Sequence, residues 1–116
     1  MIPTALRRAA LGLCVTAAPL GAAAHQLVVF ASVEDCTDVV VEAKFSNGNV
    51  AQKGEVRVLG EDRDVLSTLM LEENGTARVG LDSIDHSAGL LIEVDTGGHD
   101  NYWILTPDDI AGKCGS

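Results

Sequence analysis

Apolar and polar residues alternate along most of this chain with the period of two that is typical of β-strands. From residue 25 onward, short valine-rich runs are separated by turn-forming segments such as SNGN, EENG and TGGHDN. The pattern predicts seven strands, at residues 27–34, 38–45, 55–60, 65–71, 76–81, 90–95 and 102–105. Because one sheet alone would leave an apolar face in water, we expect an all-β fold, an antiparallel β-sandwich with Greek-key, immunoglobulin-like or prealbumin-like wiring.

Residues 1–24 have the composition of a secretory signal peptide. Two arginines and no acidic residue precede an apolar run at 9–20, and three alanines follow, the last of them Ala24. We expect cleavage between Ala24 and His25. Residues 25–116 then remain as one small β-sandwich domain in an extracytoplasmic compartment, the bacterial periplasm.

A membrane anchor is the main alternative for this first segment. Its apolar run is shorter than the roughly 20 residues that cross a bilayer, and no stop-transfer pattern follows. Lipid attachment at Cys14 is disfavoured because Leu13 stands where a small residue is preferred. We therefore expect no membrane span in the processed chain.

The chain is acidic, with 17 Asp and Glu, 8 Lys and Arg, and a formal net charge of −9. Loss of residues 1–24 removes two arginines and no acid, so the charge becomes −11. Nucleic acid and anionic lipid are therefore poor partners. The acidic surface favours cations, although the solvated face of an exported protein is enough to explain the charge by itself.

Two cysteines, Cys36 and Cys114, remain after the expected cleavage. An even number of cysteines in an oxidising compartment favours one disulfide. This bond would tie an early turn to the C-terminal tail, residues 106–116. Two separate thiols and a metal–thiolate pair are the alternatives.

Motifs that indicate catalysis are absent from the sequence. It contains no GxSxG elbow, CxxC, HExxH, GxGxxG or P-loop, and no EF-hand spacing. Tyr102 and Trp103 are adjacent in a predicted strand, so we expect one in the core and the other on the surface, which makes no platform for stacking a sugar or a base. These observations therefore favour a protein that is not an enzyme.

His25 would become the first residue of the processed chain. It would then offer both an imidazole and a free α-amine, and these two nitrogens can close a chelate ring on a metal ion. An α-amine has a pKa of roughly 7.7 to 8.0, so a metal can displace its proton near neutral pH. Nitrogen ligands of this kind suit Ni, Co, Cu and Zn rather than Ca or Mg.

His99 is the candidate for a third nitrogen ligand. It lies in TGGHDN, between the last two predicted strands. In many sandwiches the first strand runs parallel to the last and pairs with it, and this arrangement would bring His25 and His99 together. Asp100 is the carboxylate nearest in sequence that could complete the shell or orient a histidine. We expect His86, in IDHSAG, on the surface at the opposite end.

Residues 25–105 resemble the small secreted accessory components of bacterial nickel and cobalt transporters of the energy-coupling-factor class. These in turn are similar to carboxypeptidase regulatory-like, transthyretin-like sandwiches. The segments that carry the resemblance are HQLVVFASVE, VVVEAKFSNGNVAQKGEVRVLGE, LSTLMLEENGTARVGL and LIEVDTGGHDNYWIL. The cysteine pair and the tail depart from the pattern, as do Val50, Ala77 and Val79, where such sandwiches often have a proline and aromatic residues.

The resemblance implies an extracytoplasmic protein that helps deliver Ni²⁺ or Co²⁺ to a membrane metal-transporter complex, with His25 and His99 as ligands. Cu²⁺ would bind such a site more tightly than Ni²⁺ or Co²⁺. One alternative is a structural or protein-interaction module of the regulatory-like type, in which the histidines are incidental. Another is a copper enzyme with an N-terminal histidine brace, but this would need a further histidine and a substrate surface.

Overall fold

Residues 25–114 are described by the computed structural model, and within them the chain forms two antiparallel sheets. The strands are β1 (Leu27–Glu34), β2 (Asp38–Phe45), β3 (Glu55–Leu59), β4 (Val65–Met70), β5 (Thr76–Gly80), β6 (Leu90–Asp95) and β7 (Asp100–Leu105). A short 3-10 helix, η2 (Glu61–Arg63), joins β3 to β4, and the helix α2 (Pro107–Lys113) follows β7. The predicted signal peptide and its cleavage point lie outside the described residues.

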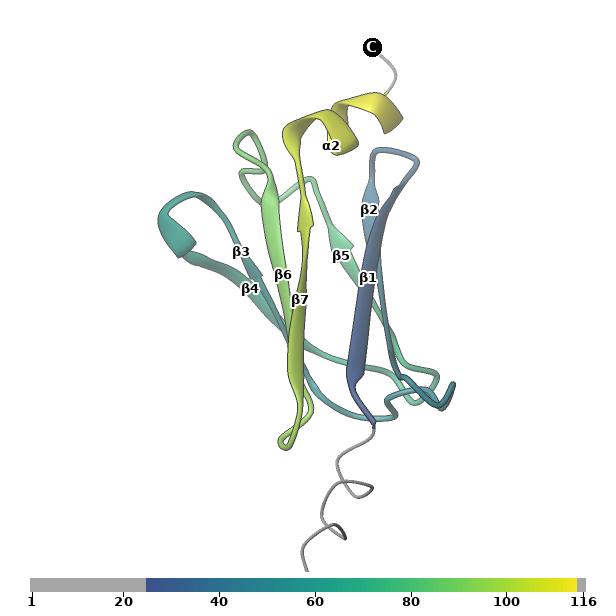
Figure 1. Cartoon of the computed structure of the whole chain (residues 1–116). Coiled ribbons are helices and arrows are strands. Elements are labelled where there is room, and N and C mark those ends of the chain that lie inside the picture. The colour runs from purple at the N-terminus through teal and green to yellow at the C-terminus, as the bar shows by residue number, and fades with distance from the viewer. Residues whose placement is uncertain (1–24, 115–116) are drawn as a thin grey trace, which may run out of the picture.

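The two sheets form the layers of a sandwich (Figure 1). One sheet has the strand order β1-β2-β5 and the other has the order β4-β3-β6-β7. Every strand pair is antiparallel. The predicted seven strands are thus confirmed within residues 25–114, although β3, β4 and β5 each end one residue earlier than expected. β7 begins two residues earlier than expected, because Asp95 and Asp100 extend its ladder with β6.

The core lies between the inner faces of the two sheets and consists of small branched side chains. The largest fully buried residues are Ile92, Val39, Val41, Val56, Val58 and Val94. Among residues 25–114 no polar or charged side chain is buried. Such an interior can hold the two sheets about 10 Å apart, but it offers no buried group for chemistry, so a functional site must lie on the surface.

The C-terminal segment is the main correction to the sequence-based prediction. Residues 107–113 form a helix, where we expected only a tail. Thr106 caps this helix, because its side chain accepts a hydrogen bond from the Asp109 amide at 3.1 Å while the Asp109 carboxylate accepts one from the Thr106 amide at 2.9 Å. Ile110 then packs into the core with 3% exposure. The TPDD sequence is a signature of this capping box.

The disulfide between Cys36 and Cys114 is present, which confirms the predicted pairing. Cys36 lies in the tight turn between β1 and β2, where Asp35 and Cys36 both have positive φ angles, 57° and 63°. Positive φ angles at both central residues of a tight turn match the right-handed twist of the flanking strands. The bond therefore holds the C-terminal end of α2 against the far end of β1.

Within the described residues no helix is long and apolar enough to cross a membrane.

Candidate functional site

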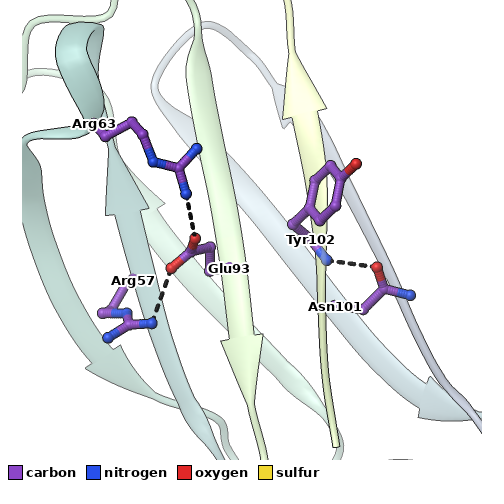
Figure 2. Close-up of polar contacts among 5 residues, drawn as sticks. All are labelled: Arg57, Arg63, Glu93, Asn101 and Tyr102. Carbon is purple, nitrogen blue, oxygen red and sulfur yellow. Dashed lines mark hydrogen bonds and ion pairs between the residues drawn. The ribbon is translucent and has the colours of Figure 1, made fainter.

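The strands β1 and β7 lie side by side along one edge of the sandwich and run in the same direction (Figure 1). They belong to different sheets, so the expected pairing of the first strand with the last was wrong although their direction was right. The Asn101 side chain joins them instead: its amide nitrogen donates to the Leu27 carbonyl at 2.9 Å, and its amide oxygen accepts from the Tyr102 main-chain N–H at 2.8 Å. Figure 2 shows the second of these contacts.

This bridge fixes the register between the two parallel strands. His25 lies two residues before Leu27, and His99 lies two residues before Asn101. On parallel strands, two residues that lie the same number of positions before a bridged pair lie at the same end of the sandwich. The topology therefore brings the two predicted metal-binding histidines to one end of the molecule.

The β1 start is attached to the chain that leaves β2. Gln26 donates its main-chain N–H to the Ser46 hydroxyl at 3.0 Å and accepts the Ser46 main-chain N–H at 2.8 Å. His25 itself is exposed. Because Gln26 is held at both its N–H and its carbonyl, the position of the residue before it is restricted.

His99 is held by the turn between β6 and β7. Its carbonyl accepts hydrogen bonds from the Thr96 amide at 2.8 Å and from the Thr96 hydroxyl at 3.1 Å. Gly97 has a φ of +100°, which a residue with a side chain rarely adopts, and its amide donates to the Asp95 carboxylate at 2.8 Å. The His99 ring meets the Phe45 ring edge-on, with centroids 5.4 Å apart. His99 therefore contacts Phe45, while Gln26, the residue after His25, is bonded to the next residue, Ser46.

Asp100 points to another part of the surface. It lies opposite Asp95, which in turn lies opposite Glu55 on the neighbouring strand. It also lines a small hollow with Arg57 and Tyr102, away from Phe45 and His99. The row of three carboxylates can raise the local concentration of cations, but the geometry does not place Asp100 in the groove beside His99.

An open groove runs past His99 along the segment that follows β2. Its lining residues are Phe45, Asn49, Val50, Ala51, Gln52, Lys53, Thr96, Gly98 and His99. None of these carries a carboxylate, and Lys53 is the charged residue among them. Sequence reasoning missed Lys53 because the segment from 46 to 54 has no strand periodicity that would place it beside the β6–β7 turn.

The nitrogen donors at this end fit a transition metal better than Ca²⁺ or Mg²⁺, because borderline metals prefer imidazole and amine ligands. Residues 25–114 contain no group of three or more His, Cys, Asp or Glu side chains that could hold a metal ion. The predicted set of metal ligands is of another kind, because it combines two imidazoles with a main-chain amine. That amine would form only when the chain is cleaved before His25.

Four exposed apolar side chains lie along the β1–β7 seam and in the hollow beside it. Val28, Phe30, Val50 and Trp103 are 42%, 44%, 43% and 37% exposed. The Phe30 and Trp103 rings meet edge-on across the β1–β7 seam, with centroids 4.9 Å apart. We call these four residues the apolar patch.

The apolar patch corrects the expectation that one of Tyr102 and Trp103 is in the core, because both are exposed. Trp103 lies opposite Ile92, on the inner face of its sheet. However, β7 is an edge strand, so its tryptophan covers the side of the sandwich rather than the interior.

The ion pairs lie on the outer faces of the sheets. Glu93 accepts from Arg57 at 2.9 Å and from Arg63 at 3.5 Å, as Figure 2 shows. Arg78 pairs with Glu34 at 2.6 Å and with Asp38 at 3.0 Å, and these hydrogen bonds raise the pKa of its guanidinium further. Such exposed pairs contribute little to stability, and neither set adjoins the histidines.

His86 lies in the loop before β6, where its carbonyl accepts from the Gly89 amide. At the start of the same loop, the Leu81 amide donates a hydrogen bond to the Thr37 carbonyl, next to Cys36 in the turn between β1 and β2. His86 is therefore at the opposite end from His25 and His99, as expected, and it provides a matched control for them.

The Asp85 carboxylate in this loop has its pKa lowered, first by the hydrogen bond from the Ser87 hydroxyl and then by that from the Ser87 amide, at 2.7 and 3.1 Å. We expect Ser87→Ala to raise the pKa of Asp85 towards its ordinary value, measured by NMR titration of the side-chain carboxyl. Because the pKa is lowered in the folded state, this contribution to stability is present above the unfolded-state pKa and is lost as the pH falls through the folded-state one. Ser83→Ala is the control, and an unchanged Asp85 midpoint in Ser87→Ala would contradict the assignment.

Comparisons with known proteins find no match: no protein-family model, no curated protein and no solved structure matches this chain.

Proposed function

We propose that this protein is an exported transition-metal-binding accessory protein that assists nickel or cobalt uptake through a membrane transporter. The observation that carries the proposal is that His25 and His99 lie at one end of the sandwich. The Asn101 side chain bonds to Leu27, Gln26 bonds to Ser46, and the His99 ring contacts Phe45. The disulfide supports an extracytoplasmic location, because such bonds persist in oxidising compartments.

In this proposal the metal ion is cargo, and the protein binds and releases it without catalytic turnover. The α-amine and the imidazole of His25 close a chelate ring, and the His99 imidazole supplies a third nitrogen. The edge-on contact with Phe45 and the hydrogen bonds of Thr96 limit the freedom of His99 before the ion arrives, and such preorganisation reduces the entropy lost on binding. Asp100 lies outside the groove beside His99, so this proposal does not use it as a ligand.

The test is titration of the processed protein, residues 25–116, with Ni²⁺, Co²⁺ and Cu²⁺. We expect one ion per chain, with Cu²⁺ bound most tightly and Ni²⁺ more tightly than Co²⁺. Adding one glycine before His25 moves the amine out of its chelate position, so a direct ligand is lost. We expect the metal affinity to fall roughly 100-fold, because loss of an outer-sphere partner alone can already lower it by about that factor. His99→Ala should weaken binding similarly, and affinity should fall below about pH 6, where imidazoles become protonated.

Two further measurements test the proposal, one for the specificity of the site and one for the cleavage before His25. His86→Ala removes an imidazole at the opposite end and should leave the titration unchanged. Intact mass of the exported protein should show that residues 1–24 have been removed. If the glycine-extended protein binds as tightly as the processed one, the N-terminus is not a ligand.

A protein-interaction module is the second candidate function, and the apolar patch favours it. Val28, Phe30 and Trp103 form a continuous exposed strip at the seam of two edge strands, and exposed aromatic side chains commonly act as anchors in protein interfaces. On this alternative the patch contacts a protein partner and the histidines are incidental. Failure of the metal titration would make it the better account.

A further inference from the structure

The groove beside His99 has a charge that differs from that of the molecule as a whole. The processed chain is expected to carry a formal charge of −11, yet the residues lining this groove include Lys53 and no carboxylate. Within residues 25–114 Lys53 takes part in no ion pair. A bare divalent cation would be repelled by Lys53, whereas an anion at the same place would be attracted.

The uncharged groups in the groove also suit an anion. Asn49 and Gln52 provide side-chain amides that can donate hydrogen bonds, and both are exposed beside Lys53. The groove has a volume of about 610 Å³, which leaves room for a small organic molecule next to the His99 imidazole.

The donor set of the proposed metal site leads to the same conclusion. An amine and two imidazoles are neutral when they bind a metal, so they leave the charge of a divalent ion uncompensated. They also leave coordination positions open on the ion. A chelator with carboxylates could fill those positions, neutralise the ion and place its remaining carboxylate against Lys53.

We infer that the cargo of this site is a divalent metal already bound to a small polycarboxylate, and that Lys53 recognises the chelator. This inference rests on the proposed function, since it names the form in which the same site receives its metal. His25 and His99 bind the metal, while Lys53, Asn49 and Gln52 hold the carboxylates. The resulting complex contains protein, metal and chelator in equal numbers.

The probe is the Ni²⁺–citrate complex, applied to the processed protein by equilibrium dialysis with radiolabelled citrate. Three arms are compared: Ni²⁺ alone in a non-coordinating buffer, citrate alone, and Ni²⁺ with citrate. We expect citrate to be retained only with Ni²⁺, at one molecule per chain. Lys53→Gln should lower the affinity for Ni²⁺–citrate about tenfold, the lower end of what a hydrogen bond to a charged group contributes, and should not weaken binding of Ni²⁺ alone, because it removes a positive charge from the groove.

Lys44→Gln is the matched control, because Lys44 is also an exposed lysine but lies on β2 outside the groove. The inference is overturned if the protein takes Ni²⁺ and leaves citrate free, or if Lys53→Gln and Lys44→Gln behave alike. Absence of binding in the arm with Ni²⁺ alone and in the arm with Ni²⁺ and citrate overturns the proposed function and the inference with it. Binding of Ni²⁺ with exclusion of citrate removes only the inference.

Discussion

Replacement of Ile92 by alanine is expected to lower the free energy of unfolding by about 4 kcal/mol, within the range for truncating a buried isoleucine. Ile92 is 0% exposed and lies on β6 between Val58 of β3 and Trp103 of β7. Truncation removes apolar contacts and leaves a cavity that β-sheet neighbours on both sides cannot close. The measurement is urea denaturation of residues 25–116 with the disulfide intact. The urea midpoint should fall while the dependence of the unfolding free energy on urea concentration stays the same.

Ile104→Ala is the matched control for this prediction. Ile104 is 57% exposed on the outer face of β7, so the same truncation should cost about 0.5 kcal/mol or less. Equal losses in the two variants would mean that the inner and outer faces of the four-stranded sheet have been assigned incorrectly.

The strands could be predicted from the sequence because their signal is local. Alternation with a period of two in LVVFASVE and DVVVEAKF places Val29, Val39 and Val41 on an inner face, and the turn residues between the runs mark the ends. The helix α2 was missed for a related reason: seven residues with one buried apolar side chain, Ile110, give no helical period. Only the capping pattern of Thr106 and Asp109 could have indicated it.

The candidate site was predictable only in part. The sequence places His25 and His99 at the starts of the first and last strands, and the parallel arrangement of β1 and β7 then brings them to one end. The contacts that define the site come from elsewhere, from Phe45, Asn101 and Lys53. Their roles depend on how the segment after β2 crosses the end of the sandwich, and no local pattern in the sequence records that path.

The disulfide and the proposed metal site lie at opposite ends of β1, and this separation makes their effects distinguishable. Cys36 lies two residues after the last residue of β1, and His25 lies two residues before its first. Eight strand residues separate the two ends, which corresponds to roughly 26 Å at the rise of an extended strand. Loss of the disulfide should therefore change stability while leaving the metal titration of the folded protein unchanged.

Removal of the disulfide by Cys36→Ser with Cys114→Ser is expected to lower the free energy of unfolding by about 4 kcal/mol, because the bond closes a long loop in the unfolded chain. The two cysteines are 78 residues apart, and their Cα atoms are 4.6 Å apart. Urea denaturation of the oxidised protein beside the double variant provides the measurement.

A second variant distinguishes the covalent bond from the backbone of the turn. Position 36 has a positive φ of 63°, which costs a residue with a side chain roughly 1 kcal/mol. Glycine has no such cost, so Cys36→Gly with Cys114→Ser should be more stable than the double serine variant by about that amount. Both should remain less stable than the oxidised protein, and coinciding urea midpoints for the oxidised and double serine proteins would show that the bond does not stabilise the fold.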